Sequence, residues 1–431
     1  MIENEELPEQ LAEPESLAPL LSAPRNQFTE VVSSLAGLED VCSQLESGAG
    51  AIALDAERAS GYRYSQRAYL IQIFRREGGL HLIDPIAFPE SERSQVFAEL
   101  NGILRGTEVV IHASSQDLPC LREIGISPVQ IFDTELAARI AGFPRVGLGA
   151  LTESLLNLRL AKEHSAVDWS QRPLHHDWLI YAALDVDVLL DLKDEIVRVL
   201  EEKKKLAWAL QESQAMLDAP PPMPRKEPWR RTSGIHQIKR PEQLALIREL
   251  WIARDALAQE RDIAAGRILN DRALVNIAMK NPKSALQLNE MSAAKKDGKH
   301  WWRAIERAHA NPHVPRPAPT DGPPAHMRVW KERAPIAYAR LTHARARLTQ
   351  CALELDLPVE NLLSPDAVKR FCWQDPPPGG RNESEVAELL RQFGARAWQV
   401  AFAAPILLAV ESEREPLPAT EPAAEDVSEL S

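Results

Sequence analysis

Two proline-rich segments divide this chain and limit the size of any single core. Residues 219–228 read APPPMPRKEP and residues 314–325 read VPRPAPTDGPPA. Proline fixes φ and lacks a backbone donor, so neither segment can continue a helix or a sheet. The 431-residue chain is therefore expected to fold as separate domains around these breaks.

The part before the first break mixes strand and helix patterns. Short apolar runs predict strands at residues 51–54, 69–74, 80–84 and 108–112. Helical periodicity predicts helices at residues 134–142, 148–157 and 176–204. Early strands with interleaved helices indicate an α/β domain with a mixed sheet. Beyond the first break the pattern is helical throughout, which predicts two all-α domains.

These patterns give a set of expected boundaries. They are a disordered acidic tail (1–26), the α/β domain (27–210), a linker (211–229), a helical domain (230–300), a linker with the second proline-rich break (301–326), a second helical domain (327–410) and another disordered acidic tail (411–431). The two helical domains are expected to be repeats. A shift of 94 residues aligns 251–279 with 345–373, and Asp262 then matches Asp356.

The charge of the chain is unevenly distributed. The net charge is −12, yet residues 1–30 and 411–431 each carry seven acids and one Arg. Residues 221–350 hold 25 Lys and Arg against 12 Asp and Glu, a local charge of +13. Local charge decides how a surface meets phosphate, so this segment predicts a nucleic-acid partner. A merely solvated helical surface remains the alternative.

Targeting and cysteine patterns point to the cytoplasm. The acidic N-terminus has no apolar core, and the longest apolar stretch, near residues 400–410, contains Pro405. We therefore expect neither a signal peptide nor a membrane span. The four cysteines form no C-x-x-C pair, which is typical of reduced thiols.

Four acids in the α/β domain are candidates for a single site. Asp55 and Glu57 close the first strand, where positions i and i+2 share a face. Asp117 follows the last predicted strand, at the expected start of a helix, where the helix dipole alone also favours an acid. Asp185 interrupts the apolar face of a helix, one turn after Tyr181.

Clustered carboxylates need a positive partner. Neighbouring acids raise each other's pKa unless a cation lies between them, and a lone buried carboxylate is unfavourable. Carboxylate oxygens without a His or Cys cluster suit Mg²⁺ or Mn²⁺. Acids from a strand, a loop and a later helix can converge on two such ions. Asp187 and Asp191, farther along the same helix, are expected to be solvated.

Three motifs in this domain resemble those of a known family. Asp55-Ala-Glu57, His112 to Asp117 and Tyr181 to Asp185 resemble, in order and spacing, the three motifs of ribonuclease D, of the DEDD exonuclease superfamily. The resemblance implies a ribonuclease H-like exonuclease domain spanning roughly residues 30–205. Residues 230–292 resemble the helical HRDC domain, and residues 327–410 resemble a divergent second copy.

The resemblance implies a function as well as a fold. Asp55, Glu57, Asp117 and Asp185 would hold two divalent ions, and Tyr181 would orient the attacking water or take its proton. The implied reaction is 3′-to-5′ trimming of RNA, such as tRNA precursors, with release of nucleoside 5′-monophosphates. A monomer is expected. A DNA exonuclease of the same superfamily and a non-catalytic RNA-binding scaffold remain alternatives.

Two further residues are second-rank candidates for substrate binding. Gln72, inside an apolar strand, can reach the terminal nucleotide or satisfy a neighbouring backbone group. Lys162 precedes the last motif and can contact a phosphate or remain solvated.

Overall fold

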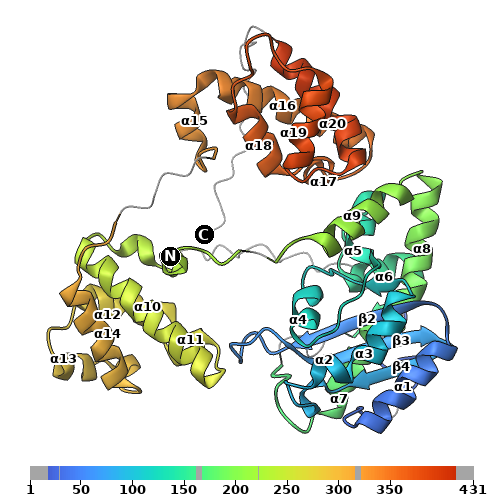
Figure 1. Cartoon of the computed structure of the whole chain (residues 1–431), viewed down its shortest axis with the longest axis horizontal. Coiled ribbons are helices and arrows are strands. Elements are labelled where there is room, and N and C mark those ends of the chain that lie inside the picture. Colours follow the sequence, from blue (N-terminus) through green and yellow to red (C-terminus); the bar gives the residue numbers. More distant parts are fainter. Residues whose placement is uncertain (1–17, 29, 162–166, 222, 316–321, 414–431) are drawn as a thin grey trace, which may run out of the picture. The chain divides into compact units, whose positions relative to one another are not determined.

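The computed structural model describes residues 18–28, 30–161, 167–221, 223–315 and 322–413 (Figure 1). These residues form two compact units. The first contains the described residues up to 135 together with 145–198 and 219–312. The second contains residues 136–144, 199–218 and the described residues from 313 onward.

A five-stranded mixed sheet lies at the centre of the first unit. Its order is β4-β3-β2-β5-β6, with bounds β2 Ala49–Arg58, β3 Ala68–Arg76, β4 Gly79–Ile83, β5 Val109–Ile111 and β6 Ile131–Asp133. Strand β2 is antiparallel to β3 and parallel to β5. A separate parallel pair joins β1 (Leu20–Leu21) and β7 (Arg159–Leu160). The expected mixed sheet and its four predicted strands are confirmed. The fifth strand, β6, was not predicted, because only two of its three residues, Ile131 and Phe132, are apolar.

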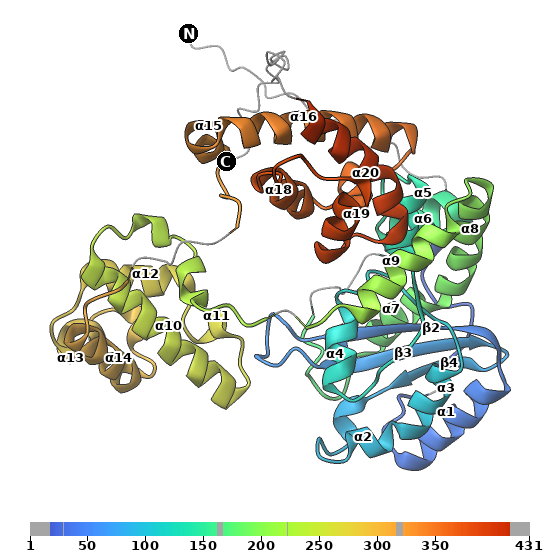
Figure 2. The same cartoon turned by 45° about the horizontal axis from the view of Figure 1, so that its top comes forward.

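Helices cover both faces of this sheet. Figures 1 and 2 show α1 and α3 on one face and α7 on the other. The helices of this part of the chain are α1 Leu35–Ser47, α2 Arg93–Val96, α3 Ala98–Arg105, α4 Asp117–Glu123, α5 Thr134–Ala141, α6 Leu148–Leu156, α7 His176–Asp187 and α8 Leu189–Glu202, with a 3₁₀ turn, η1, at Pro85–Ala87. The single helix predicted over 176–204 is therefore two helices, separated at Val188.

The rest of the described chain is helical, as predicted. Its elements are α9 Leu206–Asp218, η2 Pro228–Arg231, η3 Ile235–Gln237, α10 Pro241–Arg261, α11 Ala265–Ile268, α12 Asp271–Lys280, α13 Ala285–Asn289, η4 Ser292–Ala294, α14 Gly298–Ala310, α15 Met327–Arg333, α16 Pro335–Glu354, α17 Val359–Leu362, α18 Pro365–Trp373, α19 Glu383–Gln392 and α20 Ala397–Ser412. None of the described helices is long and apolar enough to cross a membrane.

Two of the expected linkers begin inside helices. Helix α9 extends past residue 210 because Trp208 stacks on Trp398, with ring centroids 4.9 Å apart, inside the second unit. Helix α14 extends past residue 300 because its side chains Trp301 and Ala304 are buried in the first helical domain. Both helices continue because their side chains pack against other elements. Boundaries placed from the proline-rich segments do not take such packing into account.

The two helical domains share a repeated core. Helices α16, α17 and α18 each begin 94 residues after α10, α11 and α12. Asp262 and Asp356 follow the long helices α10 and α16, and each adopts a left-handed φ of 48°. Non-glycine residues adopt this conformation uncommonly, so its recurrence supports the expected repeat.

Candidate active site

Strand β2 carries two of the four acids on one face. Ile52, Ala53 and Leu54 are fully buried, so the strand is fixed in the core just before Asp55. Asp55 and Glu57 are two residues apart, and strand geometry directs both side chains to the same face of the sheet. A rigid central strand therefore sets the separation of these two carboxylates.

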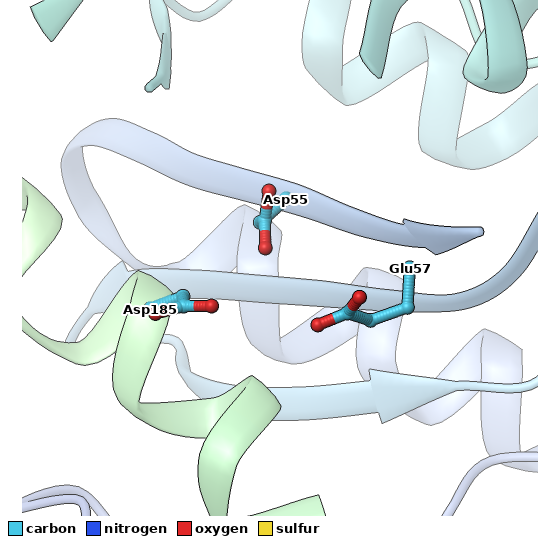
Figure 3. Close-up of side chains that lie close together, drawn as sticks. All are labelled: Asp55, Glu57 and Asp185. Carbon is cyan, nitrogen blue, oxygen red and sulfur yellow. The ribbon is translucent and has the colours of Figure 1, made fainter. Parts of the chain in front are cut away.

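Helix α7 brings a third acid to the same point. Asp185 contributes a carboxylate oxygen that, with one oxygen each from Asp55 and Glu57, forms a group whose atoms all lie within 4.8 Å of one another. Figure 3 shows the three carboxylates directed toward a shared space, two from the sheet and one from the helix. Oxygen atoms this close to one another could all bind a single divalent cation.

The fourth acid lines the same cavity. Asp117 is the first residue of α4 and is buried, with 6% of its surface exposed. It lines a cavity of about 500 Å³ together with Asp55, Glu57, Asp185 and Tyr181. The structure thus brings all four predicted acids and the tyrosine to one cavity, with three of the acids in the tight group.

Burial and mutual repulsion make these carboxyls unusually basic. Burial raises the pKa of Asp55 to about 6. Burial, followed by the charge of Asp55, raises the pKa of Asp117 to about 9. Burial is also the main cause that raises the pKa of Glu57 and of Asp185 well above the ordinary range, and Asp55 adds to both. Bound cations would offset this repulsion, and the all-oxygen donor set fits Mg²⁺ or Mn²⁺.

Tyr181 faces the acids as a neutral phenol. Burial, with the charge of Asp185 as the next cause, raises the pKa of Tyr181 above its ordinary value. The hydroxyl therefore keeps its proton at neutral pH. It suits a hydrogen-bonding role in orienting a water or a phosphate better than the role of a general base.

Of the two candidates for substrate binding, the structure describes Gln72 but not Lys162. Gln72 pairs in register with Asp55, is fully buried and does not line the cavity. Neither atom of its amide has a hydrogen-bond partner among the described residues, so it does not satisfy the backbone. Lys162 lies outside the described residues.

Two residues with a place at the site were not singled out from the sequence. Asp133, at the end of β6, accepts hydrogen bonds from the backbone N–H groups of Ala113 (3.2 Å) and Ser114 (2.8 Å), which fixes the turn before Asp117. Arg58 lines the cavity, and its positive charge lowers the pKa of Asp55 and of Asp117. The only advance signals were the position of Arg58 beside the first motif and the IFDTELAAR segment around Asp133.

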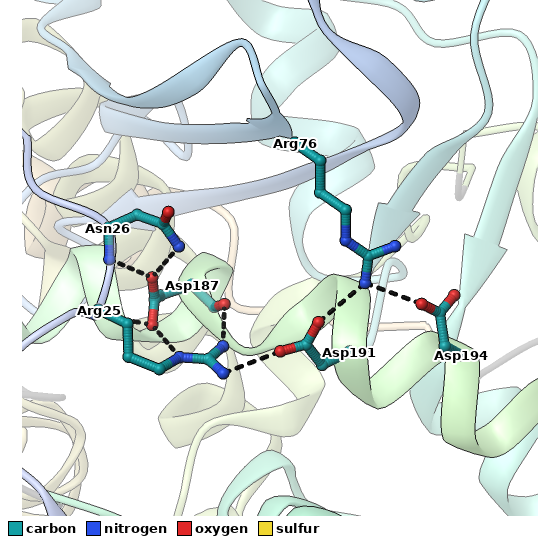
Figure 4. Close-up of polar contacts among 6 residues, drawn as sticks. All are labelled: Arg25, Asn26, Arg76, Asp187, Asp191 and Asp194. Atoms are coloured by element: carbon teal, nitrogen blue, oxygen red, sulfur yellow. Dashed lines mark hydrogen bonds and ion pairs between the residues drawn. The ribbon is translucent and has the colours of Figure 1, made fainter.

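The expectation that Asp187 is solvated is wrong, whereas Asp191 is exposed over 40% of its side chain but is also ion-paired. Asp187 is buried, and its carboxylate accepts hydrogen bonds from the backbone N–H groups of Arg25 and Asn26, both at 3.0 Å, and from both side chains (Figure 4). Asp191 pairs with Arg25 at 2.9 Å and with Arg76 at 2.8 Å. The error arose because the partners come from distant segments, which helical periodicity does not reveal.

Comparison with known proteins identifies the family. A model described as 3′-5′ exonuclease matches residues 29–201, and an HRDC domain model matches residues 243–305. Ribonuclease D of Acidiphilium cryptum is 31% identical over 303 residues, which cover 67% of this chain and 74% of the relative. The chain belongs to the ribonuclease D family. Ribonuclease D of Escherichia coli K12 is 30% identical over 278 residues, covering 62% of this chain and 72% of the relative.

Solved structures support the architecture of this ribonuclease D family member. A protein from Bifidobacterium adolescentis is 35% identical with a TM-score of 0.83, covering 91% of this chain and 99% of that one. Ribonuclease D of Escherichia coli, at 24% identity and a TM-score of 0.63, shares the fold. A separate model, the 3′ to 5′ exonuclease C-terminal domain, matches residues 322–410, the region expected to be a divergent HRDC copy. The family assignment and the exonuclease domain make this chain a 3′-5′ exoribonuclease.

Proposed function

We propose that this exoribonuclease binds two divalent cations, Mg²⁺ or Mn²⁺, through Asp55, Glu57, Asp117 and Asp185. It uses them to hydrolyse the last phosphodiester of an RNA 3′ end and releases nucleoside 5′-monophosphates. The observation that carries the proposal is the group of carboxylate oxygens within 4.8 Å of one another, with the fourth acid in the same cavity. When bound, such ions stabilise developing charge and make a nucleophile available at neutral pH.

The protein's own residues have distinct tasks in this reaction. The four acids provide negative oxygen donors at fixed positions, two of them on the most central strand of the sheet. The Tyr181 hydroxyl orients the attacking water by hydrogen bonding, because its raised pKa keeps it protonated. Arg58 lies at the cavity wall, where its guanidinium can pair with the phosphate of the incoming nucleotide.

The basic segment fits a structured substrate. Residues 221–350 carry 25 Lys and Arg against 12 Asp and Glu, and phosphate contacts of this kind hold nucleic acid without reading its sequence. A folded RNA with a single-stranded 3′ extension, such as a tRNA precursor, meets both requirements. The body of the RNA would bind the basic helices while the 3′ end enters the cavity.

A cleavage assay tests the proposal directly. A hairpin RNA with a 5′ label and a 3′ extension is incubated with the purified protein and Mg²⁺ or Mn²⁺, with and without chelator. We expect stepwise shortening from the 3′ end, nucleoside 5′-monophosphates as products, no reaction with chelator, and slower degradation of the matched DNA. An RNA that stays intact in the presence of either metal would refute the proposal.

A further inference from the structure

The loop between β2 and β3 forms one wall of the active-site cavity. Ser60, Gly61 and Tyr62 line the cavity beside the acids. The loop makes a local turn, in which the backbone N–H groups of Tyr62 and Arg63 both donate to the carbonyl of Ala59 at 2.8 Å. This turn alone does not fix the wall, because the outer part of the loop has further backbone groups that need partners.

The first helical domain supplies those partners. Asp262, directly after α10, accepts hydrogen bonds through Oδ1 from the backbone N–H groups of Tyr64 (3.1 Å) and Ser65 (2.8 Å). The hydroxyl of Tyr69 donates to Oδ2 of the same carboxylate at 3.3 Å. The backbone N–H of Ala264 donates to the carbonyl oxygen of Tyr62 at 2.9 Å. One short segment of the helical domain therefore satisfies the backbone of the loop at three places.

Arg267 contacts two of the three loop residues that line the cavity. Its Nε donates to the carbonyl oxygen of Gly61 at 2.6 Å. Its guanidinium lies over the ring of Tyr62, 3.9 Å from the ring centroid. An arginine stacked on an aromatic ring restricts that ring, so Arg267 fixes how Tyr62 faces the cavity.

The equivalent aspartate makes similar contacts in the second repeat. Asp356 is equivalent to Asp262 and has the same φ of 48°. Its carboxylate forms an ion pair with Lys203 at 2.6 Å. Its backbone carbonyl accepts a hydrogen bond from Lys205 at 2.8 Å. In each repeat, the aspartate that follows the long helix has a left-handed backbone conformation and contacts residues of the exonuclease region. The recurrence indicates a docking element common to both repeats and independent of the particular loop contacted.

We infer that Asp262 and Arg267 are positioning residues for the active site: they hold the loop wall that receives the 3′-terminal nucleotide. The inference rests on the proposed function for the identity of the ligand, but the contacts themselves do not. The inference predicts that the first helical domain helps the active site to bind the terminal nucleotide, in addition to any binding of the RNA body, by keeping Gly61 and Tyr62 in place.

Hydrogen exchange tests the contacts in the full chain without any assay of nuclease activity. In Asp262→Ala, the amides of Tyr64 and Ser65 lose a charged acceptor, so we expect them to exchange at least about tenfold faster. Asp262→Asn keeps an acceptor oxygen and should exchange at an intermediate rate. Asp297→Ala is the matched control. Among the described residues the Asp297 carboxylate pairs with Arg261 of the same helical domain, so its loss should leave both amides unchanged. Unaltered exchange in Asp262→Ala would overturn the inference.

Kinetics on a short single-stranded RNA separates positioning from mere stability. For Asp262→Ala and Arg267→Ala we expect KM to rise about tenfold while kcat stays within about twofold, since binding of the last nucleotide is lost. A lower kcat with unchanged KM, together with a lower melting temperature, would mean a purely structural role and would count against the inference. If the wild-type chain cleaves no RNA but the exchange results hold, the proposed function fails while the docking contacts stand.

Discussion

At the scale of single residues, the metal ligands are the sharpest test. Asp185→Asn preserves shape but removes one negative oxygen donor from the group of three acids. Loss of even an outer contact at a metal site reduces activity about 10–100-fold, so we expect a loss of at least about a hundredfold here. The measurement is the rate of RNA shortening at saturating Mn²⁺, with circular dichroism to verify folding. Unchanged turnover would remove Asp185 from the site.

The raised carboxyl pKa values predict how pH acts on the metal-free enzyme. The pKa of Asp55 rises from 3.8 to about 6, and that of Asp117 from 3.8 to about 9. A group whose pKa is higher in the folded state contributes stability that is complete below its unfolded pKa and is lost as pH rises through its folded pKa. The metal-free protein should therefore lose stability progressively between about pH 4 and about pH 9.

Divalent metal should oppose this loss. We expect the melting temperature in Mn²⁺ to exceed that in chelator by several degrees near pH 8, and the difference to shrink toward pH 5. Differential scanning fluorimetry across this range measures both curves. Asp117→Asn, which cannot ionise, should flatten the curve obtained in chelator. A metal effect that is independent of pH contradicts the expectation.

Gln72 presents a buried amide with no hydrogen-bond partner among the described residues. An unsatisfied buried amide is unfavourable by about 1–3 kcal/mol, so Gln72→Leu should stabilise the metal-free protein by about 1 kcal/mol in urea unfolding. Because Gln72 pairs in register with Asp55, we expect the same variant to lower kcat/KM by about tenfold. A gain in stability without loss of activity would show that the amide does not serve the site.

The sequence anticipated the acids better than their surroundings. Asp55 and Glu57 end an apolar strand and Asp185 interrupts an apolar helix face. These signals, with the order and spacing of the three motifs, predicted that the acids converge, and the structure brings these three together. The roles of Asp133 and Arg58 could not be predicted in the same way. Asp133 acts through backbone groups about 20 residues earlier in the chain, and only the fold brings these together.

At the scale of elements, the N-terminal segment holds the end of the helix that carries Asp185. The buried carboxylate of Asp187 accepts four hydrogen bonds from Arg25 and Asn26 (Figure 4). Asp187→Ala leaves these donors without their acceptor, and we expect it to lower the free energy of unfolding by about 3 kcal/mol. Urea denaturation measures the change.

A nearby aspartate provides the control for that variant. Asp194 pairs with Arg76 but its side chain is 56% exposed, so Asp194→Ala should change stability by less than about 0.5 kcal/mol. Arg25→Ala should reproduce part of the Asp187 effect, and the double variant should be less than additive. Equal effects of Asp187→Ala and Asp194→Ala would mean that the segment does not brace the helix.

Strands and helices were predicted where the local sequence pattern was clear. Helix ends were missed where the sequence pattern did not mark them. Four of the five strands of the sheet and the helical repeat with its offset of 94 residues followed from pattern alone. The break at Val188 and the continuation of α9 past residue 210 did not. The continuation of α9 depends on a partner remote in sequence, because Trp208 stacks on Trp398.

At the scale of the whole molecule, the basic helical segment predicts salt-dependent binding of structured RNA. Lys295, Lys296 and Lys299 are exposed on the first helical domain. Replacing all three with Gln should weaken hairpin binding and reduce the slope of log K against log salt by up to about 2.7, if each contacts a phosphate. Fluorescence anisotropy at several salt concentrations measures the slope. Cleavage of a short single strand serves as the control and should be unaffected, whereas an unchanged slope would place the RNA elsewhere.

Asp55 and Glu57 lie on β2, the central strand of its sheet, which is bonded to β3 on one side and β5 on the other. Such a strand opens only when the whole domain does, while loops, chain ends and outer helices fray first. Partial melting or a protease cut in a proline-rich connection therefore spares the pair of acids. On heating, the spacing of these two acids should persist until the sheet itself comes apart.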